Sequence, residues 1–171
     1  MLHEAVPGHI LQGSYTQQIQ GLPEFRKMYR TVAYGEGWGL YAESLGPELG
    51  VYRDPYSQFG RLSSERFRAA RLVVDTGLHA MGWPRAQAID YFKTHAPAVS
   101  LAEIDRYIGW PSQALGYKIG ELKITELRHK AESELGEKFD VREFHDAILR
   151  NGPPPLDMLE EQVTAYVRAA K

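Results

Sequence analysis

The sequence predicts an all-α fold. Apolar residues recur at helical spacing through most of the chain, and no stretch alternates apolar and polar residues between turn signals for long enough to indicate a strand. Prolines, glycines and N-capping residues mark where helices start and stop. We therefore expect one irregular multi-helix domain over residues 1–171.

The expected helices follow from this punctuation. In chain order they cover residues 2–20, 24–30, 32–45, 55–80, 84–92, 100–109, 112–135, 140–150 and 156–170. The first should be broken at Pro7, because proline lacks an amide donor and clashes with the carbonyl four residues back. Asp54, Ser100 and Asp140 stand at N-cap positions, and Gly136 is a natural C-cap. The helix over 55–80 should bury an apolar stripe of Phe59, Leu62, Phe67, Ala70, Val74 and Leu78.

Composition excludes several classes of function. The net charge of −2 supplies no positive field to attract nucleic acid, so nucleic-acid binding is not expected. No apolar run approaches the roughly 20 residues of a membrane span, so no membrane span is expected. Because the chain has no cysteine, any metal must be held by His, Asp or Glu. The sequence leaves the cellular compartment open.

The first dozen residues carry the strongest chemical signal. His3-Glu4 is followed by His9, whereas in the common H-E-x-x-H zinc motif the second histidine stands four residues after the first. Six residues of regular helix turn through about 600°, which leaves the two imidazoles about 120° apart around the axis. A kink or π-type bulge at Pro7-Gly8 is expected to re-aim His9, so that both histidines can bind one ion.

Glu36, in the segment Gly35-Glu36-Gly37-Trp38, is the candidate third ligand. Zinc peptidases of the gluzincin type take their third ligand from a glutamate on a later helix, and three protein ligands leave one position open for water. The alternative is a chance pair of histidines, with Glu36 on a solvated helix face. The two glycines argue against that alternative. Glycine weakens a helix, so its presence on both sides of Glu36 suggests close backbone approach or a need for room. Glu43, seven residues on, lies on the same helix face.

Four motifs, in order and spacing, closely resemble a bacterial family, the "domain of unknown function 885". They are HEAVPGH (3–9), EGWGLYAE (36–43), RLVVDTGLH (71–79) and PSQALGYKIG (111–120), the last preceded by Tyr107. The resemblance implies a helical fold related to thimet oligopeptidase and carboxypeptidase Taq, with zinc as cofactor and metallopeptidase-like activity. It covers the C-terminal part of longer family members, so we expect the C-terminal catalytic part of a longer protein. Ser112 stands where the family usually has glycine, and Ile10 where it often has a second histidine.

Other polar residues receive roles from spacing and from the resemblance. Asp75 and His79, an i, i+4 pair, are expected within hydrogen-bond reach, either as a structural pair at a helix surface or as an orienting pair or proton shuttle. The resemblance favours the second role. Tyr107 and Tyr117 straddle the Trp110-Pro111 break. Either is a candidate oxyanion donor, the alternative being a half-buried aromatic residue.

Basic and amide side chains near these motifs are candidates for binding a substrate carboxylate. The proposed substrate-binding residues are Arg106, Lys118 and Gln113, with Arg68 as a further candidate. The competing interpretation is that such residues on helices are merely solvated. Arg71, four residues before Asp75, could instead neutralise that carboxylate.

The functional hypothesis is a zinc-dependent peptidase-like hydrolase. His3, His9 and Glu36 would hold Zn²⁺, while Glu4 would take a proton from the bound water and return it to the leaving amine. A peptide is the expected partner, and a homo-oligomer is an option if apolar surface is exposed. The alternative is a non-catalytic helical remnant or a complementing fragment that binds a partner. The substrate, and endo- versus exopeptidase action, stay open.

Overall fold

The computed structural model describes residues 1–98 and 100–171, and this part of the chain is helical without any strand. The all-α prediction is confirmed. The elements are α1 (His9–Gln18), α2 (Glu24–Met28), α3 (Val32–Ser44), α4 (Pro55–Ala80), α5 (Arg85–His95), α6 (Leu101–Gly109), α7 (Gln113–Leu135), the 3₁₀ turn η1 (Gly136–Lys138), α8 (Val141–Leu149) and α9 (Leu156–Ala170). None of the described helices is long and apolar enough to cross a membrane.

The predicted caps start the helices at the expected places. The Asp54 carboxylate accepts hydrogen bonds from the backbone N–H groups of Tyr56 and Ser57, at 2.9 and 3.0 Å. The Asp140 carboxylate accepts one from the Arg142 N–H at 2.8 Å, and the Ser100 hydroxyl accepts a longer one from the Ala102 N–H at 3.3 Å. These side chains satisfy amide donors that have no partner inside the helix.

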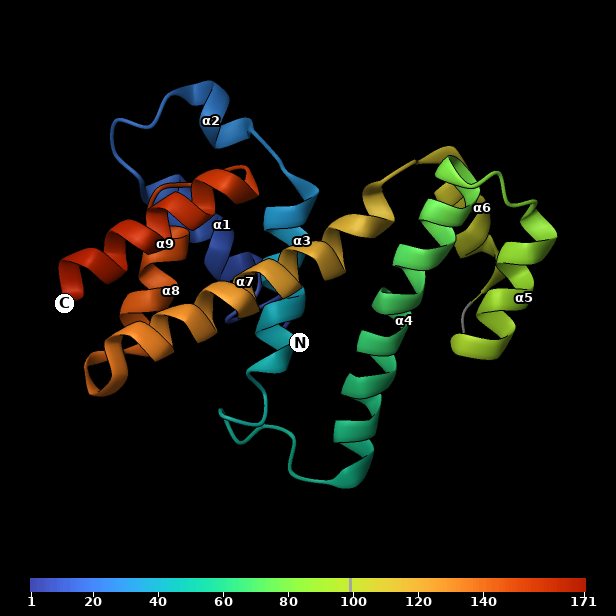
Figure 1. Cartoon of the computed structure of the whole chain (residues 1–171), viewed down its shortest axis with the longest axis horizontal. Helices are drawn as coiled ribbons and strands as arrows, with labels where there is room; N and C mark the ends of the chain where they lie inside the picture. Colours follow the sequence, from blue (N-terminus) through green and yellow to red (C-terminus); the bar gives the residue numbers. More distant parts are fainter. Residues whose placement is uncertain (99) are drawn as a thin grey trace.

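Two expectations about the helices are wrong. The helix expected over residues 2–20 exists only from His9 onward, and residues 2–8 form turns. In the apolar stripe of α4, Ala70 and Val74 are buried, but Phe59 and Leu62 are 70% and 48% exposed. The reason is that α5 and α6 cover only the C-terminal end of α4, while its N-terminal end extends past them (Figure 1).

The buried apolar residues form two clusters. The larger joins α3, α7, α8 and α9 and includes Trp38, Ile124, Phe144 and Leu159. The smaller joins α4, α5 and α6 with the first turn of α7. Helix α7 runs from one group of helices to the other and crosses α3 on the way (Figure 1). The site described below lies beside this crossing.

Glycines let α3 and α7 approach very closely. A Cβ atom on Gly120 would lie 1.8 Å from the Ala33 carbonyl oxygen, and one on Gly37 would lie 2.5 Å from the Gly120 Cα atom. Neither position can hold a larger residue without moving a backbone. The close approach predicted for the glycines around Glu36 therefore holds for Gly37, whereas Gly35 faces open space.

Candidate metal centre

A wide backbone turn, rather than a kinked helix, brings the two histidines together. The His9 N–H donates to the His3 carbonyl at 2.9 Å, and the Ile10 N–H donates to the Glu4 carbonyl at 3.0 Å. Gly8 permits this closure, because a Cβ atom there would lie 1.8 Å from the His3 carbonyl oxygen. The Trp38 indole N–H donates to the Pro7 carbonyl at 2.8 Å and fixes the turn against α3. Because His3 is outside any helix, the angular mismatch expected from the sequence does not arise.

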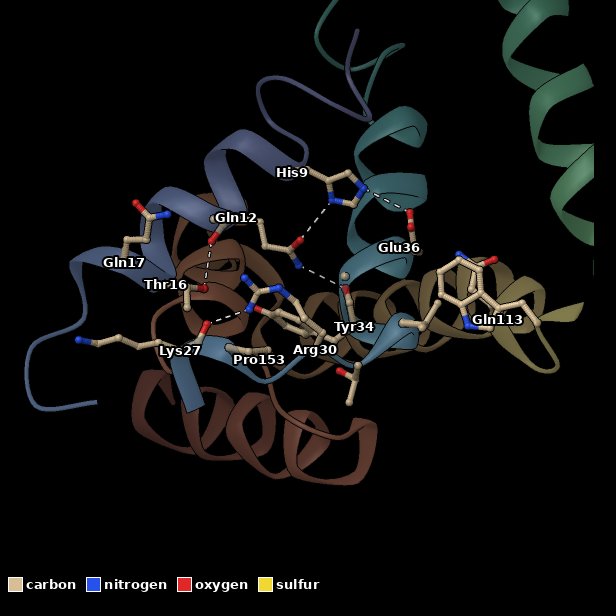
Figure 2. Close-up of a pocket in the computed structure, with 15 residues that line it drawn as sticks. His9, Gln12, Thr16, Gln17, Lys27, Arg30, Tyr34, Glu36, Gln113 and Pro153 are labelled. Atoms are coloured by element: carbon tan, nitrogen blue, oxygen red, sulfur yellow. Dashed lines mark hydrogen bonds and ion pairs between the residues drawn. The ribbon is translucent and has the colours of Figure 1, made fainter. Parts of the chain in front are cut away.

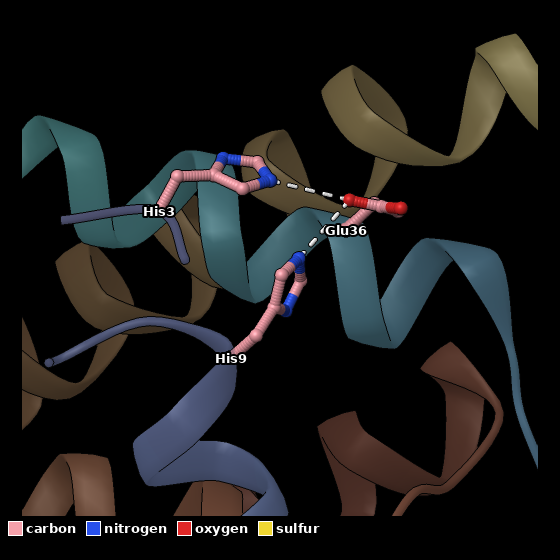
Figure 3. Close-up of side chains that lie close together, drawn as sticks. All are labelled: His3, His9 and Glu36. Carbon is pink, nitrogen blue, oxygen red and sulfur yellow. Dashed lines mark hydrogen bonds and ion pairs between the residues drawn. The ribbon is translucent and has the colours of Figure 1, made fainter. Parts of the chain in front are cut away.

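The turn places both imidazoles against the carboxylate of Glu36. The Nε2 atoms of His3 and His9 each lie 3.2 Å from the same oxygen, Oε2 of Glu36. One ligand atom from each of the three residues can be chosen so that all lie within 4.8 Å of one another. Figure 3 shows the two rings, one from the N-terminal turn and one from the start of α1, pointing toward Glu36 on α3. The sequence had predicted these three residues as a ligand set.

Two neighbouring side chains hold the far nitrogens of the histidine rings. Nδ1 of His3 lies 2.7 Å from Oε1 of Glu43, whose other oxygen accepts a hydrogen bond from the Ser64 hydroxyl at 3.2 Å. Nδ1 of His9 lies 3.4 Å from Oε1 of Gln12. Since these oxygens can only accept, each Nδ1 carries a proton, and so each Nε2 is the ring nitrogen that faces Glu36. There Nε2–H can donate to the Glu36 carboxylate, and a metal ion would take the place of that proton.

The donor set suits a divalent cation such as zinc. Two neutral imidazole nitrogens and one carboxylate oxygen are common zinc ligands, and three protein ligands leave a position for water. Gly39 makes room for the first ring, because a Cβ atom there would lie 2.7 Å from Nε2 of His3. The residues therefore fit the metal that the sequence implied.

The electrostatics of the cluster favour positive charge. Burial alone lowers the pKa of His3, but hydrogen bonds to Glu36 and Glu43 outweigh it and raise the pKa to about 9. Burial alone raises the pKa of Glu36, but hydrogen bonds from His3, His9 and Tyr117 hold it well below its usual range. The pocket thus stabilises a cation, whether a proton or a metal ion.

Glu4 follows the ligand His3 in the chain, and Tyr117 lies against the His3 ring; the catalytic roles of both stay predictions. The Glu4 side chain is exposed and takes part in no hydrogen bond or ion pair with the described residues. The Tyr117 ring stacks on the His3 ring with centroids 6.1 Å apart and planes 22° apart. Its hydroxyl is close enough to Glu36 to lower the pKa of that carboxyl.

Tyr107 lies elsewhere. Its side chain is 1% exposed within the smaller apolar cluster, and its hydroxyl donates to Oε2 of Glu103 at 2.9 Å. No hydrogen bond among the described residues joins it to the ligands. The Trp110-Pro111 break therefore brings Tyr117 to the centre and leaves Tyr107 in a core.

The pairing expected between Asp75 and His79 is not formed. The buried Asp75 carboxylate accepts from the Ser112 backbone N–H at 3.2 Å, at the start of α7. The exposed His79 instead places Nε2 2.8 Å from the carbonyl oxygen of Tyr107. Spacing placed the two residues on one helix face but could not show that other elements offer each a partner. Their catalytic role stays a prediction.

The candidate substrate-binding residues have different surroundings. Lys118 is held between Glu65 and Glu121, with N–O distances of 2.8 and 2.7 Å, so it links α4 to α7 and has little capacity left for a substrate. Oε1 of Gln113 accepts from Arg71 at 3.0 Å and from Arg106 at 3.4 Å. Gln113 also reaches toward the Tyr117 hydroxyl at 3.5 Å.

A cavity of about 430 Å³ opens directly onto the ligands. His9, Glu36 and Gln113 are among the residues that line it, together with Tyr34 and the exposed Trp110. Figure 2 shows Gln12 between His9 and Tyr34 in its wall. Any molecule in this cavity would lie beside the open side of the candidate centre.

Three residues of the site were not assigned by sequence reasoning. From the sequence, Glu43 is recognisable only as sharing a helix face with Glu36, and nothing in the pattern indicates a role for Gln12. The spacing of Arg71 indicates only a partner for Asp75. Glu43 could have been found, because a second carboxylate on the face of a presumed ligand is a natural partner for a ligating imidazole.

The fold and site define an all-helical protein with a two-histidine, one-carboxylate cluster beside its central helix crossing. The chain belongs to the family described as "Bacterial protein of unknown function (DUF885)", which matches residues 1–163. Membership of this family, expected from the four motifs, is confirmed. The likeness to thimet oligopeptidase and carboxypeptidase Taq stays a prediction.

Two solved structures resemble the chain over nearly its whole length. A crystal structure from Colwellia psychrerythraea, described as a "putative lipoprotein", has a TM-score of 0.94 and 47% identity, and the match covers 98% of this chain and 29% of that chain. A structure from Shewanella oneidensis, described as a "putative lipoprotein of unknown function", has a TM-score of 0.82 and 22% identity, covering 95% and 30%. This chain therefore spans less than a third of either protein. No curated protein matches it.

Proposed function

We propose that the chain carries the metal centre of a zinc-dependent, peptidase-like hydrolase. One observation carries the proposal: two imidazole Nε2 atoms converge on one oxygen of Glu36 at 3.2 Å each, while partners at both Nδ1 atoms hold the two rings in this orientation. A structural histidine pair needs no such arrangement. The cavity beside His9 and Glu36 supplies space for a substrate.

The surrounding residues divide the chemistry of hydrolysis among them. Zinc held by His3, His9 and Glu36 would supply Lewis-acid activation of water. Glu4, exposed and without a partner among the described residues, would accept a proton from water and later return it to the leaving amine. The Tyr117 hydroxyl, beside Glu36, donates to the developing oxyanion.

Metal content tests the ligand assignment. The purified chain, loaded with zinc and dialysed, should retain about one equivalent by elemental analysis, as should the Glu4→Gln variant. Glu36→Gln and His3→Ala each remove a ligand and should retain much less under the same dialysis. Glu161→Gln, at an exposed carboxylate on α9, is the matched control and should behave like the wild type. Equal zinc in all five proteins contradicts the site.

Cleavage tests the base. On a peptide library, Glu4→Gln should lower the rate by roughly 10²–10⁴-fold while zinc content holds, because it removes the proton acceptor and little else. In Glu36→Gln, by contrast, activity should fall together with zinc. If the wild type binds zinc through these ligands and yet cleaves no peptide, the alternative of a non-catalytic domain is favoured.

A further inference from the structure

A second cavity, of about 690 Å³, lies on the α4 side of Tyr117 and is lined by an unusual number of arginines. Its charged residues are Arg66, Arg68, Arg71, Arg106 and Glu103. The one carboxylate cannot neutralise four guanidinium groups. Such a cavity favours an anion.

Arg71 is the most constrained of these arginines. It is 2% exposed, and its guanidinium lies 4.1 Å from the centre of the Tyr117 ring. Its Nη2 donates to Gln113 at 3.0 Å, its Nε has no partner, and no described carboxylate lies within ion-pair distance. Burying a charge without an opposite charge is strongly unfavourable, so a missing anionic partner would explain the arrangement.

The neighbouring arginines repeat the pattern. Arg68 donates through Nη1 to the Ser64 hydroxyl at 2.8 Å, and its buried Nε has no partner. Arg106 forms an ion pair with Glu103 at 3.0 Å, and its Nε is likewise buried and unpartnered. Planar guanidinium groups with spare donors are suited to bidentate contact with a carboxylate.

We propose that this arginine cavity, defined by Arg68, Arg71 and Arg106, binds a carboxylate of the substrate. One ring, that of Tyr117, separates it from the metal centre, because this ring stacks on His3 and also underlies Arg71. A peptide held there by its carboxylate has a backbone bond near the candidate zinc site. The claim that this cavity lies next to the peptide bond to be cleaved rests on the proposed function, whereas the claim that it binds a carboxylate does not.

The binding of short peptides to a variant that should not cleave them tests the proposal. The probes are N-acetyl-Ala-Ala-Leu with a free C-terminal carboxylate, its C-terminal amide, and the amide of N-acetyl-Ala-Glu-Leu, titrated calorimetrically into zinc-loaded Glu4→Gln protein. The free carboxylate should bind roughly 10–100-fold more tightly than the first amide. If the glutamate amide recovers this gain, the cavity takes acidic side chains; if only the free acid does, it takes the chain terminus.

Variants locate the binding site. Adding Arg68→Gln should abolish most of the preference for carboxylate, whereas Arg142→Gln, with a side chain 86% exposed on α8, should leave it unchanged. Arg68 serves better than the buried Arg71, whose replacement threatens the fold, and thermal melts check that each variant is folded. The proposal is overturned if the peptide acid and the peptide amide bind equally well or if neither binds. It is also overturned if Arg68→Gln has no effect on the preference for the acid. Carboxylate selectivity without zinc retention would leave it standing and reject the proposed function instead.

Discussion

At the scale of single residues, the candidate centre depends on what holds the far side of each ligand. The Glu43 carboxylate, 2.7 Å from Nδ1 of His3, holds a proton on that nitrogen and so directs Nε2 toward Glu36. Ser64 in turn holds the second oxygen of Glu43 at 3.2 Å. The hydrogen bonds from Ser64 on α4 to Glu43 on α3, and from Glu43 to His3, therefore set the orientation of this ligand ring.

The contact between Glu43 and His3 predicts a measurable effect on zinc affinity. Glu43→Ala should weaken zinc binding by roughly 10–100-fold, because His3 loses the partner that orients it and raises its basicity. The dissociation constant is measured by competition with a chromophoric chelator. Glu161→Ala is the control for loss of a carboxylate at an exposed helix position, and it should bind zinc as the wild type does. Unchanged affinity in Glu43→Ala would show that the contact is not needed.

The sequence predicted the ligands better than their surroundings. His3, His9 and Glu36 were recognisable because their residue types and order are those of zinc sites, and the structure brings them together. The hydrogen-bond partners of these and other polar side chains could not be predicted in the same way. Asp75 and His79 share a helix face, yet contacts with Ser112 and Tyr107 decide their orientation, and those contacts depend on tertiary packing.

At the scale of secondary-structure elements, helix ends followed from local chemistry. Asp54 and Asp140 cap α4 and α8 as expected, because a cap depends on residues within one turn. The buried face of α4 did not follow in the same way. Phe59 lies on the predicted apolar stripe but is 70% exposed, since spacing cannot tell how far a neighbouring helix extends.

The crossing of α3 and α7 is the contact on which the site geometry depends. It brings Glu36 on α3 next to Tyr117 on α7 through backbone contact at Gly37, Gly116 and Gly120. The sequence indicated that glycines beside Glu36 needed close approach but not which helix approached. That information lies in the partner segment, about 80 residues away.

Alanine at this crossing should therefore be strongly destabilising. Gly120→Ala would place a Cβ atom 1.8 Å from the Ala33 carbonyl, so the helices must separate, and the free energy of unfolding should fall by about 1–3 kcal/mol or more. Gly60→Ala in α4 is the matched control, because its Cβ atom faces open space and alanine favours helix by about 0.5–1 kcal/mol. Urea denaturation measures both. Similar effects for the two variants would contradict a tight crossing.

At the scale of the whole molecule, a partly buried histidine, His145, ties α8 to α3 beside the larger apolar cluster. The His145 ring packs edge-on against Trp38 and Tyr41, with centroids 5.4 and 5.5 Å away. The Tyr41 hydroxyl lies 2.9 Å from Nε2 of His145 and accepts from Arg128 at 3.3 Å. When Nε2 of His145 is unprotonated, the hydroxyl can donate its proton to that nitrogen while it accepts from Arg128.

Stability should consequently fall as the solution becomes acidic. Burial, and then the positive charge of Arg128, lower the pKa of His145 to about 4 in the folded chain, against 6.5 in an ordinary setting. Between these values the unfolded chain binds the proton and the folded chain does not, so this contribution is fully present above about pH 6.5 and is lost toward pH 4. Lowering the pH from 7 to 4.5 should remove about 2 kcal/mol through His145.

The variant His145→Gln isolates that contribution. Glutamine can accept the Tyr41 hydrogen bond but does not titrate, so the variant should lose less stability than the wild type between pH 7 and 4.5. Urea denaturation in the presence of a chelator measures the free energy of unfolding of both proteins at each pH. Other titrating groups, including His3 and His9, are present in both proteins and cancel in the difference. Equal pH dependence would mean that His145 is protonated in the folded chain, and that the bond from Tyr41 is not formed in solution.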